Sequence, residues 1–371
     1  MKLHLLNSFR MKPYIYLRGL RHAEHTVFSV QDGQKYYRDL QFNTDQAYSS
    51  GQQVKRSILD ALTGELNVLP APITFNWQVK KGKKPEDVQF EQKEPWSPCD
   101  PSHVDQLVGG YMRAETGEIT VKRRSPLSIS AMRPLHPLLG GLERQEENLS
   151  FDRTSHPAHH PVRVRDEKGI ELSPEELSDL LIKTNRTLPN RKWIPGQTRA
   201  SGLFVYDVCV DMRTLFCVST NTQEPELHPD KIASLKAQGW IETSNVFGPC
   251  LLAPREQREK YIPALAHALL NWRITSNQAR TFSLMETLAV AVSDNANHLA
   301  GAIRGQLREE TEKPSAKPIL DKGAGANLYV AVMAAGYVPG EYGDVKALEQ
   351  AEQDLVSRLR AFDYENQNVP V

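Results

Sequence analysis

The chain has 371 residues, of which 40% are hydrophobic and 24% charged, an ordinary composition for a globular protein. This length suits two domains, or one domain with large insertions. The formal net charge is zero, so the whole chain does not present itself as a polyanion-binding protein. Its charges are unevenly distributed, however, with lysines crowded over 80–84 and a basic run over 122–124. Such a distribution allows a basic groove on a neutral protein.

The cysteines and the apolar runs indicate the compartment. The cysteines are widely separated and form no CxxC pair: Cys99, Cys209, Cys217 and Cys250. This pattern disfavours a zinc ribbon or a disulfide framework and favours a reducing setting. No run approaches the roughly 18 apolar residues of a membrane span, and Arg10 and Lys12 interrupt the apolar stretch near the start. We therefore expect a cytoplasmic protein with no membrane partner and no structural metal.

The first third of the chain predicts strands followed by a helix. Residues 14–18 have strand composition, and a second candidate strand over 26–30 ends at the turn signal Asp32-Gly33. Residues 36–42 could return as a further strand. A compact β-rich start therefore leads into the helix that begins after residue 50.

That helix has a polar, basic first turn. Apolar residues at helical spacing give it a core-facing side: Val54, Ile58 and Leu62. Ser50 with Gln53 fits a capping box, and Gly64 is a plausible stop. Lys55 and Arg56 add cations to a helix start that already favours anions, so a phosphate could bind there. An amphipathic helix with a solvated basic face explains the same pattern equally well.

Three regions predict insertions rather than core. Residues 70–101 are rich in proline and lysine and lose core periodicity. Residues 111–124 predict a hairpin with a basic far end, either an arm for a phosphate backbone or a solvated edge. Residues 140–200 predict a protruding arm, with a hairpin around 166–169 and a capping box at Ser173. Its histidines, separated by prolines, favour a solvated loop over a metal site: His156, His159 and His160.

The last part of the chain alternates strands and helices. Residues 201–211 and 288–292 are near-continuous apolar runs typical of a sheet centre. Helical patterns cover the remaining segments: 229–238, 259–272, 299–307, 328–335 and 345–362. Together these elements predict an α+β fold, a sheet with helices on one face.

Three blocks in this order resemble the backbone subunit of CRISPR Cascade-type effector complexes, the Cas-seven family of the RAMP superfamily. The first is Ser49-Ser50 followed by Val54-Lys55-Arg56-Ser57. The second is Ser201-Gly202-Leu203-Phe204-Val205-Tyr206. The third joins the helix 264–272, the segment Gln278-Ala279-Arg280-Thr281-Phe282 and the strand 288–293 with Asp294. A weaker fourth block is 128–134, which contains Arg133.

The resemblance implies a modified RRM-like or ferredoxin-like palm with inserted fingers and a thumb. The palm would comprise 1–69, 126–139 and 201–371 with its C-terminal helices, the fingers-like insertion 70–125, and the thumb-like arm 140–200. It also implies the residues that contact RNA: Ser49, Ser50, Gln53, Lys55, Arg56, Arg133, Gln278 and Arg280. Cations, hydroxyls and amides at these positions would hold phosphate and sugar and leave base edges free to pair.

The implied function is that of a non-catalytic subunit, without cofactor, that binds CRISPR RNA. Copies would oligomerise head to tail along the guide in a class 1, type I surveillance complex for antiviral defence. The implied partners are CRISPR RNA, target DNA or RNA paired to it, further copies of the chain and other Cascade subunits.

Three other readings stay open. Some relatives in type III complexes cleave target RNA with a loop aspartate, and Asp39 and Asp45 precede the basic helix, although both also suit turns and caps. A ribonuclease of the same superfamily that processes guides would use positioned groups such as His22 or His25. A structural protein without nucleic acid is compatible with the zero net charge.

Overall fold

In the computed structural model, the chain forms two compact units. The larger unit comprises Met1–Leu142 and Ala200–Val371, and the smaller comprises Glu143–Arg199. The structure describes residues 12–28, 34–81, 88–114, 117, 119–144, 163–186, 198–274, 282–308 and 313–367. Within these residues no helix is long and apolar enough to cross a membrane.

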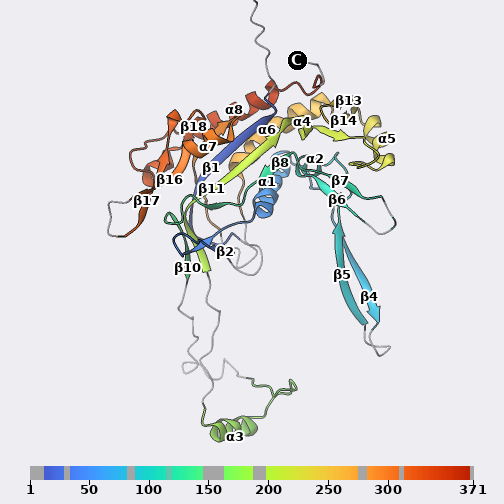
Figure 1. Cartoon of the computed structure of the whole chain (residues 1–371). Helices are drawn as coiled ribbons and strands as arrows, with labels where there is room; N and C mark the ends of the chain where they lie inside the picture. Colours follow the sequence, from blue (N-terminus) through green and yellow to red (C-terminus); the bar gives the residue numbers. More distant parts are fainter. Residues whose placement is uncertain are drawn as a thin grey trace, which may run out of the picture. The chain divides into compact units, whose positions relative to one another are not determined.

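The larger unit is built on an antiparallel sheet whose central strand is β1 (Tyr14–Thr26) (Figure 1). On one side β1 pairs with β11 (Thr198–Asp211), and on the other with β15 (Thr287–Ser293). The remaining strands lie outside this trio: β8 (Leu127–Ile129), β9 (Arg133–Pro134) and β10 (Gly140–Arg144) beside β11, and β18 (Asn327–Val330) beside β15. Every residue of β15 is buried, as its continuous apolar sequence predicts.

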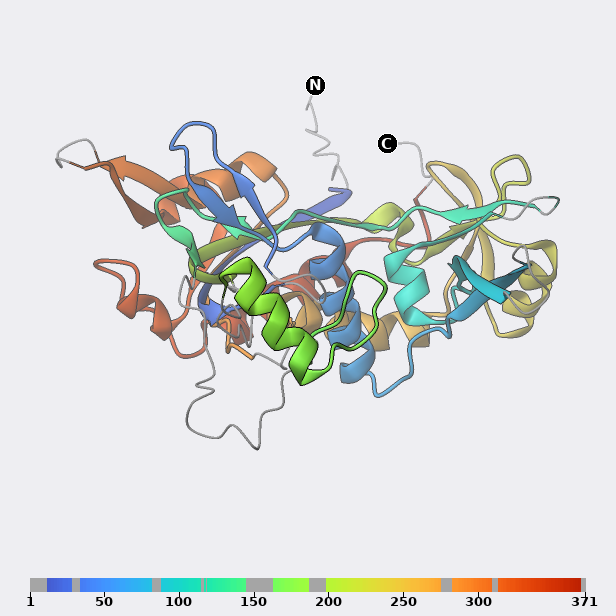
Figure 2. The ribbon, with the colours of Figure 1, turned by 90° about the horizontal axis from the view of Figure 1, so that it is seen from below.

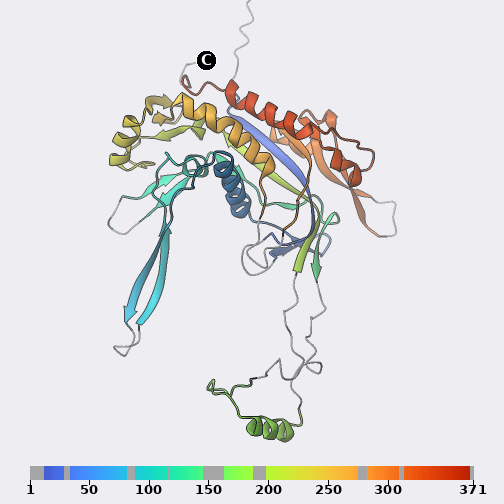
Figure 3. The ribbon, with the colours of Figure 1, turned by 180° about the vertical axis from the view of Figure 1, so that it is seen from behind.

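Three helices cover one face of this sheet, as Figure 3 shows from behind: α1 (Gly51–Glu65), α6 (Arg255–Asn271) and α8 (Ala347–Ala361). Ile15 and Leu17 of β1 point into the core beneath them together with Val54 and Ile58 of α1. The order along the chain is therefore β1, α1, β8, β11, α6, β15, while the order across the sheet is β15, β1, β11, β8.

The other elements of the larger unit are insertions and extensions of this pattern. Two hairpins and a helix separate α1 from β8: β4 (Thr74–Lys81) with β5 (Val88–Trp96), α2 (Val104–Gly109), and β6 (Tyr111–Arg113) with β7 (Val121–Arg123). A small domain separates β11 from α6: α4 (Met212–Leu215), β12 (Cys217–Ser219), α5 (Pro229–Ala237), β13 (Ile241–Asn245) and β14 (Gly248–Leu252). The hairpin of β2 (Tyr36–Arg38) and β3 (Asp45–Ala47) precedes α1.

The prediction that helices lie on one face only is wrong. A second core lies on the opposite face, where α7 (Ala296–Ala302) packs against β1 and β15. It also includes the start of β16 (Ile303–Arg308), the end of β17 (Ser315–Leu320) and the short helix η2 (Val332–Gly336), and η1 (Lys322–Ala324) packs beside it. Figure 2 shows β16–β17 and β2–β3 toward one end of the larger unit, and β6–β7 with β12–β14 toward the other.

The described part of the smaller unit is short. Arg165 and Glu171 form an isolated bridge around the predicted turn. Helix α3 (Pro174–Thr184) begins with the predicted capping box, in which Ser173 and Glu176 satisfy each other's backbone N–H groups. The predicted histidine cluster at 156–160 lies outside the described residues.

Several predicted elements are confirmed. The structure contains the predicted helix after residue 50 and the predicted hairpin over 111–124. It also contains the strands around 201–211 and 288–292 and the helices over 229–238 and 345–362. Each has a strong local signal, either helical or strand periodicity or a recognisable turn.

Other predictions are wrong. For the strands the reason is that pairing with a neighbouring strand outweighs local propensity. The separate strands over 14–18 and 26–30 are replaced by one long strand, β1, which continues through Arg18, Arg21 and His22 to Thr26. The segments 299–307 and 328–335 are not single helices, since β16 and β18 occupy parts of them. Gly64 does not end α1; the helix runs to Glu65, and Asn67 takes the left-handed conformation.

A buried arginine ties the central strand to the end of α6. Arg21 of β1 is fully buried, and its terminal nitrogens donate to the backbone oxygens of Leu270 and Trp272 at 2.8 Å each. Its guanidinium lies 4.0 Å from the centroid of the Trp272 ring. Carbonyls at a helix C-terminus carry partial negative charge that stabilises a cation. Burial lowers the pKa of Arg21 to about 10, so the side chain stays charged at neutral pH.

Replacing this arginine should weaken the whole sheet. In Arg21→Met the two carbonyls lose their donors within the core, so we expect the free energy of unfolding to fall by about 2–4 kcal/mol. Urea denaturation followed by tryptophan fluorescence measures this loss. Arg304→Met is the control, because Arg304 pairs with Asp321 at the surface and should cost less than about 1 kcal/mol. Equal losses in both variants would contradict the proposed importance of Arg21.

Candidate functional site

The N-terminus of α1 is capped as the sequence predicts, but only in part. Ser50 is the N-cap, and its hydroxyl accepts a hydrogen bond from the Gln53 backbone N–H at 3.3 Å. The Gln53 amide does not complete the box; it lies 3.5 Å from the Ser57 hydroxyl instead. Only the Ser50 half of the capping box therefore forms, and the Gln53 side chain is directed along the helix toward Ser57.

Glycine allows this helix start to approach the sheet edge. A Cβ on Gly51 would lie 2.7 Å from the backbone oxygen of Ile129 in β8, closer than real side chains pack. Just before it, Ser49 forms an isolated bridge with Met132, in which backbone N–H groups and oxygens pair at 2.9 and 3.0 Å. This bridge brings the start of α1 beside Arg133.

Lys55 in the first turn of α1 is half-buried, and no described residue forms a hydrogen bond or an ion pair with its ammonium group. Burial alone lowers the pKa of Lys55 to about 8. A half-buried cation without a counterion is costly, and an anionic ligand would compensate it. The neighbouring Arg56 is exposed and pairs with Asp60 one turn later at 2.9 Å, a weak surface contact that a ligand could replace.

Arg133 belongs to a second positive cluster on the sheet. Arg18 of β1 binds Asp207 of β11 through two hydrogen bonds, at 2.6 and 3.1 Å. Arg133 reaches the same carboxylate at 3.5 Å. Two guanidinium groups thus share one carboxylate, which leaves a surplus positive charge on residues that are partly exposed. The sequence analysis missed Arg18, although its place opposite Asp207 follows from the strand register.

The structure places the other predicted residues differently. Ser49 is buried, and its hydroxyl donates to the backbone oxygen of Phe28, so its side chain holds the loop together and is not available to a ligand. Gln278 and Arg280 lie outside the described residues. Their segment follows Trp272, the end of α6 that Arg21 binds.

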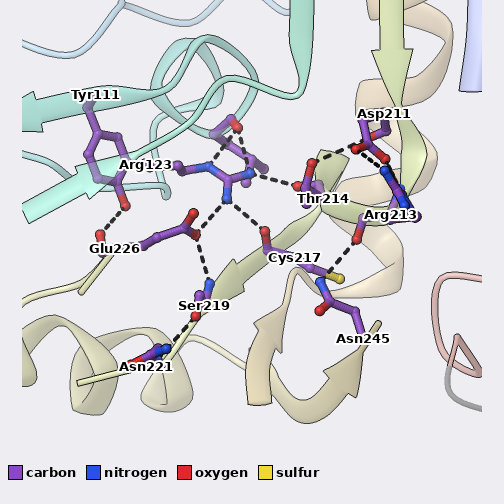
Figure 4. A network of polar contacts seen from close by, with 11 residues as sticks. Tyr111, Arg123, Asp211, Arg213, Thr214, Cys217, Ser219, Asn221, Glu226 and Asn245 are labelled. Carbon is purple, nitrogen blue, oxygen red and sulfur yellow. Dashed lines mark hydrogen bonds and ion pairs between the residues drawn. The ribbon is translucent and has the colours of Figure 1, made fainter. Parts of the chain in front are cut away.

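The basic run over 122–124 is not a uniformly charged arm. Arg123 is buried, and its guanidinium donates to the backbone oxygens of Leu107, Thr214 and Cys217 and pairs with Glu226 at 3.1 Å (Figure 4). This residue joins the hairpin to α2 and to the small domain. Only its neighbours Lys122 and Arg124 are exposed.

The side chains of Asp39, Asp45 and His22, which were candidate catalytic groups, already contact other residues of the chain. The Asp39 carboxylate accepts a hydrogen bond from the Phe42 N–H, and Asp45 pairs with Arg38 across the β2–β3 hairpin. His22 stacks on Tyr337 with ring centroids 4.0 Å apart, and its ring lies 3.3 Å from Glu286. Within the described part of the chain, no group of three or more histidine, cysteine or acidic side chains could hold a metal ion.

Comparisons with known proteins give matches to solved structures only. No family model matches the chain, and no curated protein sequence does. A chain of a solved "CRISPR RNA-guided surveillance complex, pre-nicking" is similar with a TM-score of 0.40 and 10% identity, over 94% of this chain and 88% of that chain. A chain of a "CRISPR RNA-guided surveillance complex" is similar with a TM-score of 0.36 and 9% identity, over 94% and 84%.

If the start of α1 binds an anion, the lowered pKa of Lys55 predicts that the binding depends on pH. Below pH 8 the ammonium group is charged and can bind phosphate; as the pH rises through about 8 it loses its proton. We expect the affinity for a single-stranded polynucleotide to fall about three- to tenfold between pH 7 and 9. Fluorescence anisotropy with a labelled oligonucleotide measures this change.

Lys55→Arg is the matched variant for this test, because arginine stays charged throughout the range. Its affinity should be flat from pH 7 to 9. A wild-type affinity that is equally flat would show that Lys55 does not contact the ligand.

Proposed function

We propose that this chain is a CRISPR RNA-binding backbone subunit of a class 1, type I surveillance complex in antiviral defence, in which copies assemble head to tail along the guide. The observation that carries the proposal is Lys55, a half-buried cation without a described partner in the first turn of a capped helix. With Arg56 and the surplus charge at Arg18 and Arg133, it supplies contacts for phosphate and none specific to a base. A protein that carries a variable guide needs this combination.

The order of elements supports a modified RRM-like palm. The order β1, α1, β8, β11, α6, β15, with the sheet order β15, β1, β11, β8 and both helices on one face, corresponds to the split βαβ pattern of ferredoxin-like and RRM folds. In the proposal, residues 70–125 are the fingers and residues 140–200 are the thumb.

An uncovered apolar face supports assembly with further copies. Among the described strands, β4 and β5 pair only with each other, and isolated two-stranded ribbons are marginally stable. Trp77 and Val79, and Phe90 opposite Val79, share one face because strand residues alternate. Trp77 is 59% and Phe90 67% exposed. Exposed apolar faces of this kind mark interaction surfaces, and a contact with a different surface of the next copy would repeat without closing.

The carboxylates at Asp39 and Asp45 support a non-catalytic role, since both are already engaged in the β2–β3 hairpin. In the proposal, target DNA or RNA is recognised by pairing with the guide, and cutting belongs to another subunit of the complex. If the assembled complex cleaved paired RNA, and Asp45→Ala abolished the cleavage, the ribonuclease alternative would replace this proposal.

The first test is co-purification with a guide. The chain is expressed with a CRISPR array transcript and purified through moderate salt, and the bound RNA and the mass are measured together. We expect RNA of defined length with several protein copies. Lys55→Ala combined with Arg56→Ala should weaken binding of all guide sequences alike and reduce the slope of log affinity against log salt by about 1.4. An unchanged affinity in this double variant would refute the site.

The second test concerns the ribbon. Trp77→Ser combined with Phe90→Ser should reduce the assembled species to single copies, measured by analytical ultracentrifugation, and leave the melting temperature of the monomer unchanged. The control is Gln78→Ser with Lys93→Ser on the opposite face of the same hairpin. Assembly of the first variant at the wild-type level would exclude the ribbon from the contact.

A further inference from the structure

A cavity of about 730 Å³ opens beside the sheet, away from the start of α1. It is bounded by β1, β8 and β11 of the main sheet, by β7 of the β6–β7 hairpin and by the small domain of β12–β14. Tyr14 lines it from the face of β1 opposite to Ile15 and Leu17, so the helices α1, α6 and α8 do not cover it. Its volume is within the range of small-molecule and cofactor sites.

One wall of the cavity is cationic. Lys122 and Arg124 are both exposed, and neither forms a hydrogen bond or an ion pair through its side chain with a described residue. They alternate with the buried Arg123, which holds their strand in place through four backbone and side-chain acceptors. Two cations fixed on one strand edge without carboxylate partners suit a phosphate group.

The opposite wall carries aromatic rings. The Arg213 guanidinium lies 4.8 Å from the centroids of both Tyr14 and Phe247, and Arg213 also donates a hydrogen bond to the Tyr14 hydroxyl oxygen. Asp211 fixes the same guanidinium through two hydrogen bonds of 2.9 Å and raises the pKa of Arg213. Phe247 itself is 62% exposed at the tip of β13–β14. The rings are thus held in position with surface left open, which suits stacking of a base.

The acidic groups of the cavity are largely neutralised. Asp211 is bound to Arg213, and Glu226 accepts hydrogen bonds from Arg123 and from the Ser219 N–H (Figure 4). Glu224 is exposed at the rim and has no cation partner among the described residues, so it can turn toward solvent. The cavity therefore presents Lys122 and Arg124 as its available cations, with Glu224 as the one lining carboxylate that has no described cation partner.

From this geometry we infer that the cavity binds a nucleotide unit of a single-stranded nucleic acid. Its phosphate lies against Lys122 and Arg124, and its base stacks on Tyr14 or Phe247. The inference rests on the proposed function, because the bound nucleic acid is then either the guide RNA or a second nucleic-acid strand that pairs with the guide. This site shares no residue with the one at Ser50, Lys55 and Arg56.

Photocrosslinking tests the inference on the full chain. Oligonucleotides with 4-thiouridine at successive positions are bound, irradiated and mapped by mass spectrometry. Crosslinks to the peptides of Tyr14 or Phe247 are expected, and placing the label in the guide or in an added strand identifies the source. Lys122→Ala with Arg124→Ala should weaken binding on the order of tenfold at 0.1 M salt and lower the salt slope by about 1.4. Phe247→Ala should reduce crosslinking without changing the slope.

The control is Lys260→Ala with Lys346→Ala, two exposed lysines outside both sites, which should bind like wild type. Crosslinks confined to other peptides, with Lys122→Ala/Arg124→Ala binding like this control, would overturn the inference. If only Lys55→Ala/Arg56→Ala loses binding, the cavity site fails and the proposed function stands; if neither double variant does, both fail. Loss of a protein partner with RNA binding intact would assign the cavity to that protein instead.

Discussion

The fold depends on a cation buried where two strands meet the end of a helix. Arg21 in β1 holds the last carbonyls of α6, while Tyr206 in β11 donates to the Leu269 carbonyl and packs edge-on against Trp272. Gly19 makes this possible, since a Cβ there would lie 2.2 Å from the Tyr206 ring. The central strands and α6 therefore form one rigid frame. The segment with Gln278 and Arg280, to which the resemblance assigns RNA contacts, follows directly on the end of α6 that Arg21 holds.

Elements with a strong local pattern could be predicted from the sequence, and elements defined by distant partners could not. The helix after Ser50 has three apolar residues at helical spacing and a cap, and β15 is apolar throughout. By contrast, β1 continues through Arg18 and Arg21 because each finds a partner far away in the chain, at Asp207 and at the end of α6. No residue close to these arginines in the sequence indicates either partner.

The same limit applies to the candidate site. Lys55 and Arg56 were found because they follow a capping residue, but the sequence could not show that Lys55 lacks a described partner while Arg56 has Asp60. Ser49, adjacent to the cap, turns inward to Phe28. In the run 122–124, strand alternation sends Arg123 into the core and its neighbours outward. Counting cations in sequence thus overestimates the charge available to a ligand.

Burial of arginines also decides which positive charges of this neutral chain are available to a ligand. Lysine and arginine equal aspartate and glutamate in number, yet the buried charged side chains of the described residues are all arginines: Arg21, Arg123 and Arg258. The first two are held mainly by backbone oxygens, so their guanidinium groups are not available to a ligand. An exposed cation attracts phosphate best where it is unpaired or shares a carboxylate with a second cation. Three such places among the described residues are the start of α1, the Arg18–Arg133 cluster and the Lys122–Arg124 edge. All three lie near the strand β8, since Gly51 packs against Ile129 and Ser128 lines the cavity.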